Sequence, residues 1–332
     1  MNLPACLTAA RPVPLTLAEA RQRFEREATR GVLDTGRYRC RYSVWGDGPP
    51  LLLVPGLSGR GAVFVLLTAL LSRAFCCVTY DHPVGGTDRA RLHRLTHAGL
   101  VADALALLDH LRVRQSYLYG TSFGSTVALR LLHDHPGRFP RAVLQGGFAR
   151  RPLAPAEWLL ARVARHWRGP MSHLPLFETV QCHAHFGPFA ARPLEVWRYY
   201  LDDDRPIAAV AAHALLLHGT DLRPALGAIR QPELLVSGDC DPLVSRQCED
   251  VLLAGLPNAG RAEIGGCGHL PYLSHPEALA EVVHRFLTPP AAGTSCTSAG
   301  CPVEKAIHDA AGQVLGARAF AETDDGAHAA QQ

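Results

Sequence analysis

The fold is decided by the stretch Tyr117-Leu118-Tyr119-Gly120-Thr121-Ser122-Phe123-Gly124, an apolar strand that runs into the pattern Gly-x-Ser-x-Gly. The residues directly after it, 125–132, have the pattern of a helix. A serine on so tight a turn has strained backbone angles, which glycines at the flanking positions are expected to tolerate. An ordinary glycine-rich turn can carry the same five residues, but the flanking strand and helix favour a nucleophile elbow that presents Ser122 to a substrate.

A serine hydroxyl needs a base to remove its proton and a carboxylate to hold the tautomer of that base. Both candidates follow Ser122 in the chain. A buried strand at 234–237 leads into a loop that contains Asp239 and Asp241, and a short strand at 261–264 leads into Gly268-His269. The order Ser, Asp, His therefore predicts a catalytic triad, with Asp239 and Asp241 as alternative acids. Asp241 precedes Pro242 and could also simply open a turn.

Over roughly residues 36 to 288 the chain resembles the α/β-hydrolase family. Members commonly read Gly-x-x-Asp-x-x-Val/Pro after the sixth or seventh strand and Gly-His after the last strand, which corresponds here to 238–244 and to Gly268-His269. The resemblance implies Asp241, rather than Asp239, as the triad acid and His269 as the base. The loop at 78–88 is similar to a further family motif, in which Asp81 and Asp88 are expected to shape the loop.

The resemblance also implies an oxyanion hole made of two backbone N–H groups. Strand residues 51–54 lead into Pro55-Gly56-Leu57-Ser58-Gly59, where many relatives read His-Gly. Proline replaces that histidine, so the side-chain bonds that a histidine makes there are absent. The amide of Leu57 remains available, and Leu57 and Phe123 are the predicted oxyanion donors.

Strand and helix patterns alternate along most of the chain, which predicts an α/β-hydrolase fold with a mostly parallel sheet covered on both faces. Residues 36–149 and 224–288 are predicted to form the core. Residues 1–35 are predicted as an N-terminal helical appendage, with a helix at 15–29 followed by a strand pair at 38–44. Helices are predicted at 64–71, 97–111, 125–133, 245–253 and 277–287. Residues 150–223, with Trp158, Trp167 and Trp197, are predicted as a helical lid inserted after the sixth strand, and 289–332 as a mobile tail.

Composition excludes several classes of function. The net charge is +3, and the arginines do not gather with aromatic residues as in a nucleic-acid platform. No apolar run reaches the roughly 20 residues of a membrane span, and no signal segment begins the chain, so a cytoplasmic location is expected. Ten scattered cysteines, including Cys76-Cys77, fit a reducing compartment. Cys182-His183-Ala184-His185 lacks a second pair of metal ligands, so neither a metal nor an organic cofactor is predicted.

The predicted activity is transfer of an acyl group to water, with a small and apolar carboxylic ester as the substrate. Members of the same fold that are C–C bond hydrolases, lactonases, haloperoxidase-like enzymes or acyltransferases resemble the chain equally well and remain alternatives. A non-catalytic ligand-binding protein is a further alternative, but the presence of serine, aspartate and histidine in order disfavours it. The predicted partner is thus a small molecule, and the sequence predicts no oligomeric state.

Overall fold

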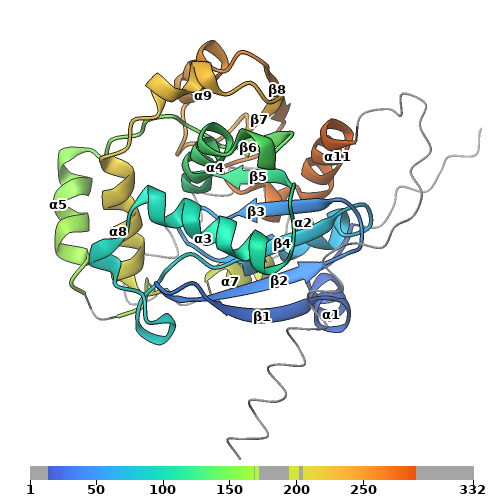
Figure 1. Cartoon of the computed structure of the whole chain (residues 1–332), viewed down its shortest axis with the longest axis horizontal. Helices are drawn as coiled ribbons and strands as arrows, with labels where there is room; N and C mark the ends of the chain where they lie inside the picture. Colours follow the sequence, from blue (N-terminus) through green and yellow to red (C-terminus); the bar gives the residue numbers. More distant parts are fainter. Residues whose placement is uncertain (1–13, 168, 172–193, 202–204, 289–332) are drawn as a thin grey trace, which may run out of the picture.

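Within the residues that the computed structural model describes (14–167, 169–171, 194–201 and 205–288), eight strands form one sheet in the order β1-β2-β4-β3-β5-β6-β7-β8 (Figure 1). Strand β2 runs antiparallel to its neighbours β1 and β4, and all the other neighbouring strands are parallel. The strands are β1 Thr29–Asp34, β2 Arg39–Trp45, β3 Pro50–Val54, β4 Cys76–Tyr80, β5 Tyr117–Thr121, β6 Ala142–Gln145, β7 Glu233–Gly238 and β8 Ala259–Ile264. This mostly parallel sheet confirms the predicted fold class.

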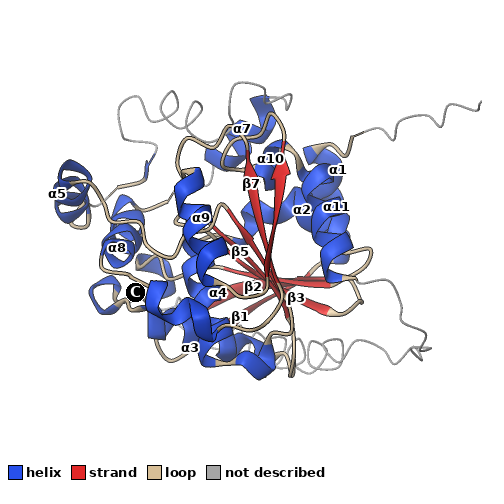
Figure 2. Cartoon of the chain, turned by 90° about the horizontal axis from the view of Figure 1, so that it is seen from above, coloured by secondary structure: helices blue, strands red, loops and turns tan. Residues whose placement is uncertain are grey.

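Helices cover both faces of the sheet, with α1, α2 and α11 on one side and α3, α4 and α9 on the other (Figure 2). The α-helices are α1 Leu17–Glu27, α2 Val65–Leu71, α3 His97–His110, α4 Phe123–Asp134, α5 Pro155–Ala164, α7 Leu194–Leu201, α8 Ile207–His218, α9 Arg246–Gly255, α10 Pro271–Ser274 and α11 Pro276–Leu287. Short 3-10 helices lie at η1 Gly61–Phe64, η2 Gly86–Asp88, η3 Leu92–Arg94, η4 Pro136–Arg138 and η6 Arg223–Ala228.

Strand β3 shows why both faces must be covered. Its side chains alternate, so Leu51 and Leu53 belong to the core under α2 and α11, whereas Leu52 and Val54 belong to the core under α3 and α4. All four are completely buried. Each such side chain contributes about 1.5–3 kcal/mol on leaving water, so a strand of this composition is stable only between two helical layers.

The N-terminal region differs from the prediction. The strand that pairs with β2 lies upstream, at β1, so the hairpin runs from residue 29 to 45 instead of occupying 38–44, with Asp34 opposite Arg39. Gly36, at φ +77°, makes the turn between the two strands. The sheet therefore begins inside the segment 1–35 that was expected to be a helical appendage. Helix α1 forms as predicted and starts with a capping box between Thr16 and Glu19.

Between β6 and β7 the described residues form α5, α7 and α8, and the one bridge recorded there joins Pro170 to Pro206. Helices α5 and α8 stand side by side at the left of Figure 1. The Trp158 ring lies near His218 on α8, and Trp167 is exposed. The side chain of Trp197, the motif at 182–185 and the predicted tail at 289–332 lie outside the described residues. Among the described helices, none is long and apolar enough to cross a membrane.

Candidate active site

Ser122 stands alone between β5 and α4 with φ 51° and ψ −122°, a left-handed backbone conformation that a non-glycine residue rarely adopts. Three hydrogen bonds hold it there, one of which runs from the backbone amide of Ser125 to the Ser122 carbonyl at 2.9 Å. Its N–H donates to the carbonyl of Gln145 at 2.9 Å, and its own carbonyl accepts from the Ser125 hydroxyl at 2.6 Å. The side chain is partly exposed, at the carboxyl end of the parallel strands. This geometry is that of a nucleophile elbow.

The structure corrects the expected role of the two flanking glycines. Positive φ is found at Ser122 itself and not at Gly120 or Gly124. A Cβ atom on Gly124 would lie 2.4 Å from the carbonyl oxygen of Val54, and one on Gly120 would lie 2.8 Å from the Cβ of Ala128. Both glycines are therefore needed because the helix packs against the strands at backbone distance, and the surrounding structure maintains the strain on the serine.

Asp241 and His269 form a buried pair. The loop after β7 carries Asp241 and the loop after β8 carries His269, and Asp241 Oδ2 lies 2.7 Å from His269 Nδ1. Only 3% of the aspartate side chain and 4% of the histidine side chain are exposed. Burial acts to raise the pKa of Asp241, but hydrogen bonds from His269 and from the amides of Val244 and Leu243 outweigh it and lower that pKa. An ionised carboxylate at Nδ1 favours the tautomer with the proton on Nδ1, in which Nε2 carries the lone pair that can accept a proton.

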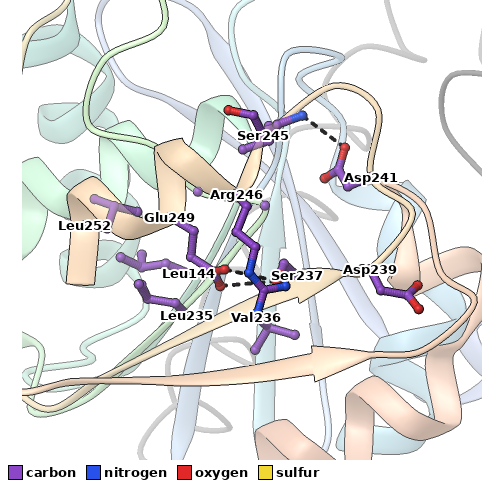
Figure 3. A pocket seen from close by; sticks show the side chains of 14 residues that line it. Leu144, Leu235, Val236, Ser237, Asp239, Asp241, Ser245, Arg246, Glu249 and Leu252 are labelled. Atoms are coloured by element: carbon purple, nitrogen blue, oxygen red, sulfur yellow. Dashed lines mark hydrogen bonds between the residues drawn. The ribbon is translucent and has the colours of Figure 1, made fainter. Parts of the chain in front are cut away.

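Asp239, the alternative acid, takes no part in this pair. It is exposed, and its carboxylate accepts a hydrogen bond from the amide of Cys267. Figure 3 shows Asp239 and Asp241 beside a small cavity of about 70 Å³, with carboxylates that point in different directions. Ser237 also lines this cavity, and its hydroxyl donates to Glu249 on α9. The structure thus brings His269 together with Asp241 and not with Asp239.

Gln145, at the end of β6, connects the elbow with the histidine loop. Its backbone carbonyl accepts from the Ser122 amide, its side-chain oxygen accepts from the Thr121 hydroxyl, and its side-chain N–H donates to the carbonyl of His269 at 3.1 Å. The next residue, Gly146, lies against the imidazole: a Cβ there would be 3.1 Å from His269 Cε1. The sequence by itself assigns no role to Gln145. Gln145 is completely buried and bonds both to the turn that carries Ser122 and to the loop that carries His269.

Among the backbone amides near Ser122 that have no partner within the described part of the chain are those of Leu57 and Phe123. Phe123 is the first residue of α4, where an N–H has no intrahelical acceptor. Leu57 lies in the loop after β3, and Gly56 before it approaches Ser122 so closely that a Cβ would lie 3.4 Å from the serine Cβ. The two predicted oxyanion donors therefore lie on the segments that flank the serine.

Sequence reasoning missed two buried histidines at the same loop. His82, from the segment after β4, has its Nε2 3.1 Å from the Pro55 carbonyl oxygen, and His213, from α8, has its Nδ1 3.2 Å from the Leu57 carbonyl oxygen. Burial lowers the pKa of His213 to about 4 and that of His82 well below its usual value, so both rings are neutral at pH 7. The sequence gives no signal for these contacts, because the two histidines lie far from residues 55–57 in the chain.

The remaining motif residues have structural roles. Asp88 accepts from the amides of Val84 and Ala90, and Asp81 accepts from the amide of Gly61, so both carboxylates shape loops as expected. In the described part of the chain no group of three or more histidine, cysteine or acidic side chains is arranged to hold a metal ion. Six cysteines within it are free thiols, including Cys76 and Cys77 in β4.

Comparisons with known proteins agree with this fold. The family model described as the alpha/beta hydrolase fold matches residues 49–276. A pimeloyl-[acyl-carrier protein] methyl ester esterase from Aromatoleum aromaticum is 35% identical over 251 residues, which cover 71% of this chain and 96% of the relative. A poly(3-hydroxyalkanoate) depolymerase from Ectopseudomonas oleovorans is 26% identical over 72% of this chain and 84% of its own length.

A solved structure has a similar fold. The enol-lactonase from Burkholderia xenovorans superposes with a TM-score of 0.70 and 21% sequence identity, over 78% of this chain and all of the lactonase chain. At this identity the likeness concerns the fold alone. The superposition with the lactonase covers a similar share of this chain to the sequence matches with the two relatives above.

Proposed function

Because the chain belongs to the α/β-hydrolase family, we propose that it is a serine hydrolase that cleaves the carboxylic ester of a small, apolar substrate. The observation that carries the proposal is the buried Asp241–His269 hydrogen bond at the end of the sheet where Ser122 sits on a strained elbow. The two named relatives support ester chemistry, because one is a methyl ester esterase and the other depolymerises a poly(hydroxyalkanoate).

In the proposed mechanism Ser122 is the nucleophile. His269 Nε2 takes the proton from the serine hydroxyl as its oxygen attacks the ester carbonyl, and Asp241 stabilises the imidazolium that forms. The carbonyl oxygen becomes an oxyanion that accepts hydrogen bonds from the amides of Leu57 and Phe123. His269 then protonates the leaving alcohol, and a water molecule, activated by the same imidazole, hydrolyses the acyl-enzyme.

We propose that residues 150–223 act as a lid over this site. The support is positional: α8 comes from this segment, and its His213 contacts the loop that carries Leu57. A lid of this kind excludes water and supplies contacts to the substrate. The free thiols in the described residues support a reducing, cytoplasmic location.

The first experiment is labelling with a fluorophosphonate probe, which reacts with an activated serine. The wild-type protein should be labelled and Ser122→Ala should not, whereas Ser72→Ala, at the serine between the end of α2 and the start of β4, should be labelled like the wild type. Hydrolysis of p-nitrophenyl esters should fall in Ser122→Ala by on the order of a thousandfold or more. Wild-type turnover in that variant would overturn the proposed function.

A panel of substrates separates the proposed activity from its alternatives. Esters of increasing acyl length are measured beside lactones and a ring-cleavage diketone, each with the wild type and with Ser122→Ala. Ester hydrolysis should give the highest kcat/KM. A higher value for the lactones or the diketone would keep Ser122 as the nucleophile but replace the substrate class, and labelling without turnover of any of these substrates would point to another acyl acceptor.

A further inference from the structure

In the loop from Pro55 to Gly59, three consecutive carbonyl groups each accept a hydrogen bond. Pro55 O accepts from His82 Nε2 and Leu57 O accepts from His213 Nδ1, while between them Gly56 O accepts from the amide of Gly59 at 2.9 Å. A carbonyl can only accept, so each imidazole carries its proton on the nitrogen that faces the loop. The tautomers of both histidines are thereby fixed.

This bonding decides where the Leu57 amide points. Gly56 O and the Leu57 N–H belong to one planar trans peptide unit, in which the two groups point in opposite directions. With Gly56 O held by Gly59, the Leu57 N–H must face the other way. The peptide units before and after it are held by His82 and His213, so the central unit cannot rotate without breaking at least one of the three bonds.

Packing around the loop adds to this restraint. Gly59 has φ +74°, and a Cβ there would lie 3.2 Å from the Cβ of His82 and 3.3 Å from Cε1 of His213, so the turn fits between the two rings. The backbone amide of His82 also donates to Gly59 O at 2.7 Å. Both rings lie within 6 Å of the Phe123 ring, at 5.9 Å and 5.4 Å between centroids, and both histidines are completely buried.

We propose that His82 and His213 are positioning residues of the oxyanion hole, which hold the Leu57 peptide in the one orientation that aims its N–H at the substrate carbonyl. The remaining ring nitrogens, His82 Nδ1 and His213 Nε2, are buried without a hydrogen-bond partner in the described part of the chain. Neither histidine therefore has another visible hydrogen-bonding task for its side chain.

The inference rests on the proposed function. It is tested with two double variants in which His82 and His213 are replaced by one glutamine and one asparagine, in either order. The side-chain N–H of asparagine lies the same number of bonds from Cβ as His Nδ1, and that of glutamine as His Nε2. The matched double variant, His82→Gln with His213→Asn, keeps a donor at each carbonyl. The exchanged double variant, His82→Asn with His213→Gln, contains the same two amides but places neither donor correctly.

The matched variant should keep kcat within about threefold of the wild type. The exchanged variant should lose on the order of 10- to 100-fold in kcat with little change in KM, because the Leu57 donor is present but misaligned; complete removal of such a donor costs about 100- to 1000-fold. The Ki of a trifluoromethyl ketone, whose hemiketal oxygen occupies the oxyanion hole, should rise in parallel with the loss in kcat/KM. The Ki of the corresponding unreactive alcohol should stay the same.

Equal kcat values for the two double variants, whether both high or both low, would overturn the inference, as would an unchanged Ki for the ketone. Melting curves establish the temperature at which each variant is folded, and where the exchanged double variant does not fold, its two single variants are measured by the same criteria. Ser122→Ala is run in parallel. Activity in Ser122→Ala would refute the proposed function, whereas an inactive Ser122→Ala beside a fully active exchanged variant would refute only the role of the histidines.

Discussion

Asp241 and His269 are 28 positions apart in the sequence, and their side chains meet at 2.7 Å in the interior of the protein. The contact depends on the sheet, because the two residues follow the neighbouring parallel strands β7 and β8, which pair from Glu233–Ala259 to Gly238–Ile264. Parallel strands end at the same edge of a sheet, so the loops that follow them lie side by side. A second aspartate only two positions away, Asp239, is directed elsewhere by the same loop.

The first prediction concerns these two aspartates. Asp241→Asn keeps the shape of the side chain but removes the charge that stabilises the His269 imidazolium, so kcat should fall by roughly three to four orders of magnitude. Asp239→Asn should remain within about tenfold of the wild type, since this exposed side chain bonds only to backbone amides and neighbouring loop groups. Ester turnover at saturating substrate checks both values. The reverse ranking would assign the acid to Asp239.

The second prediction concerns backbone strain at Ser122. Both Ser122→Ala and Ser122→Gly remove the nucleophile and should be inactive. Glycine adopts φ 51° without a steric penalty, whereas alanine, which has a Cβ, keeps the penalty that serine has. The free energy of unfolding of the glycine variant, measured in urea, should therefore exceed that of the alanine variant by about 1 kcal/mol. Elsewhere glycine usually destabilises, because it gives the unfolded chain more freedom. A glycine variant that is less stable than the alanine variant would show that the elbow stores no strain.

The third prediction concerns Gln145. Replacement by methionine keeps most of the volume but leaves the Thr121 hydroxyl without its acceptor and the His269 carbonyl without its donor. The free energy of unfolding should fall by roughly 1–3 kcal/mol, and kcat should fall about tenfold because the histidine loop loses its tether to the elbow.

Gln115 provides the matched control for this variant. Its side-chain N–H also donates to a carbonyl, that of Gly137 at 3.0 Å, but the residue is exposed and precedes β5, at the end of that strand opposite Ser122. Gln115→Met should change stability by no more than about 0.5 kcal/mol and leave kcat at the wild-type value. Similar losses in kcat for the two methionine variants would mean that Gln145 does not position the histidine.

The fourth prediction concerns pH and Glu233, at the start of β7. Burial raises the pKa of this carboxyl from 4.5 to about 8, and neither of its oxygens has a hydrogen-bond partner in the described part of the chain. Between these two pH values the folded protein keeps a proton that the unfolded chain releases. The stability that this group contributes is therefore full below about pH 4.5 and is lost as pH rises through the folded-state pKa.

Glu233→Gln removes this dependence, because glutamine does not ionise. The variant should match the wild type in urea unfolding near pH 4.5 and exceed it by on the order of 2 kcal/mol at pH 8. The comparison at low pH controls for the change in shape and hydrogen bonding. A stability difference that is constant from pH 4.5 to pH 8 would contradict the raised pKa.

Local pattern in the sequence is sufficient for the fold class and for Ser122 and His269 as candidates. The strand and helix periods, the glycines around the serine and the placement of histidine after the last strand are all features of short segments, and short segments determine local conformation. The core helices and the strand that precedes each candidate accordingly lie close to where the sequence predicts them.

Tertiary structure alone decides which side chains meet. The residues by themselves leave Asp239 and Asp241 as alternatives, misplace the partner of β2, and give no indication that Gln145, His82 and His213 converge on the serine and its oxyanion loop. These relationships depend on strand register and on the direction in which each loop leaves the sheet. Distances of about 3 Å between residues that are remote in the chain arise only when the two helical layers pack against the sheet. Local sequence patterns therefore do not predict these contacts.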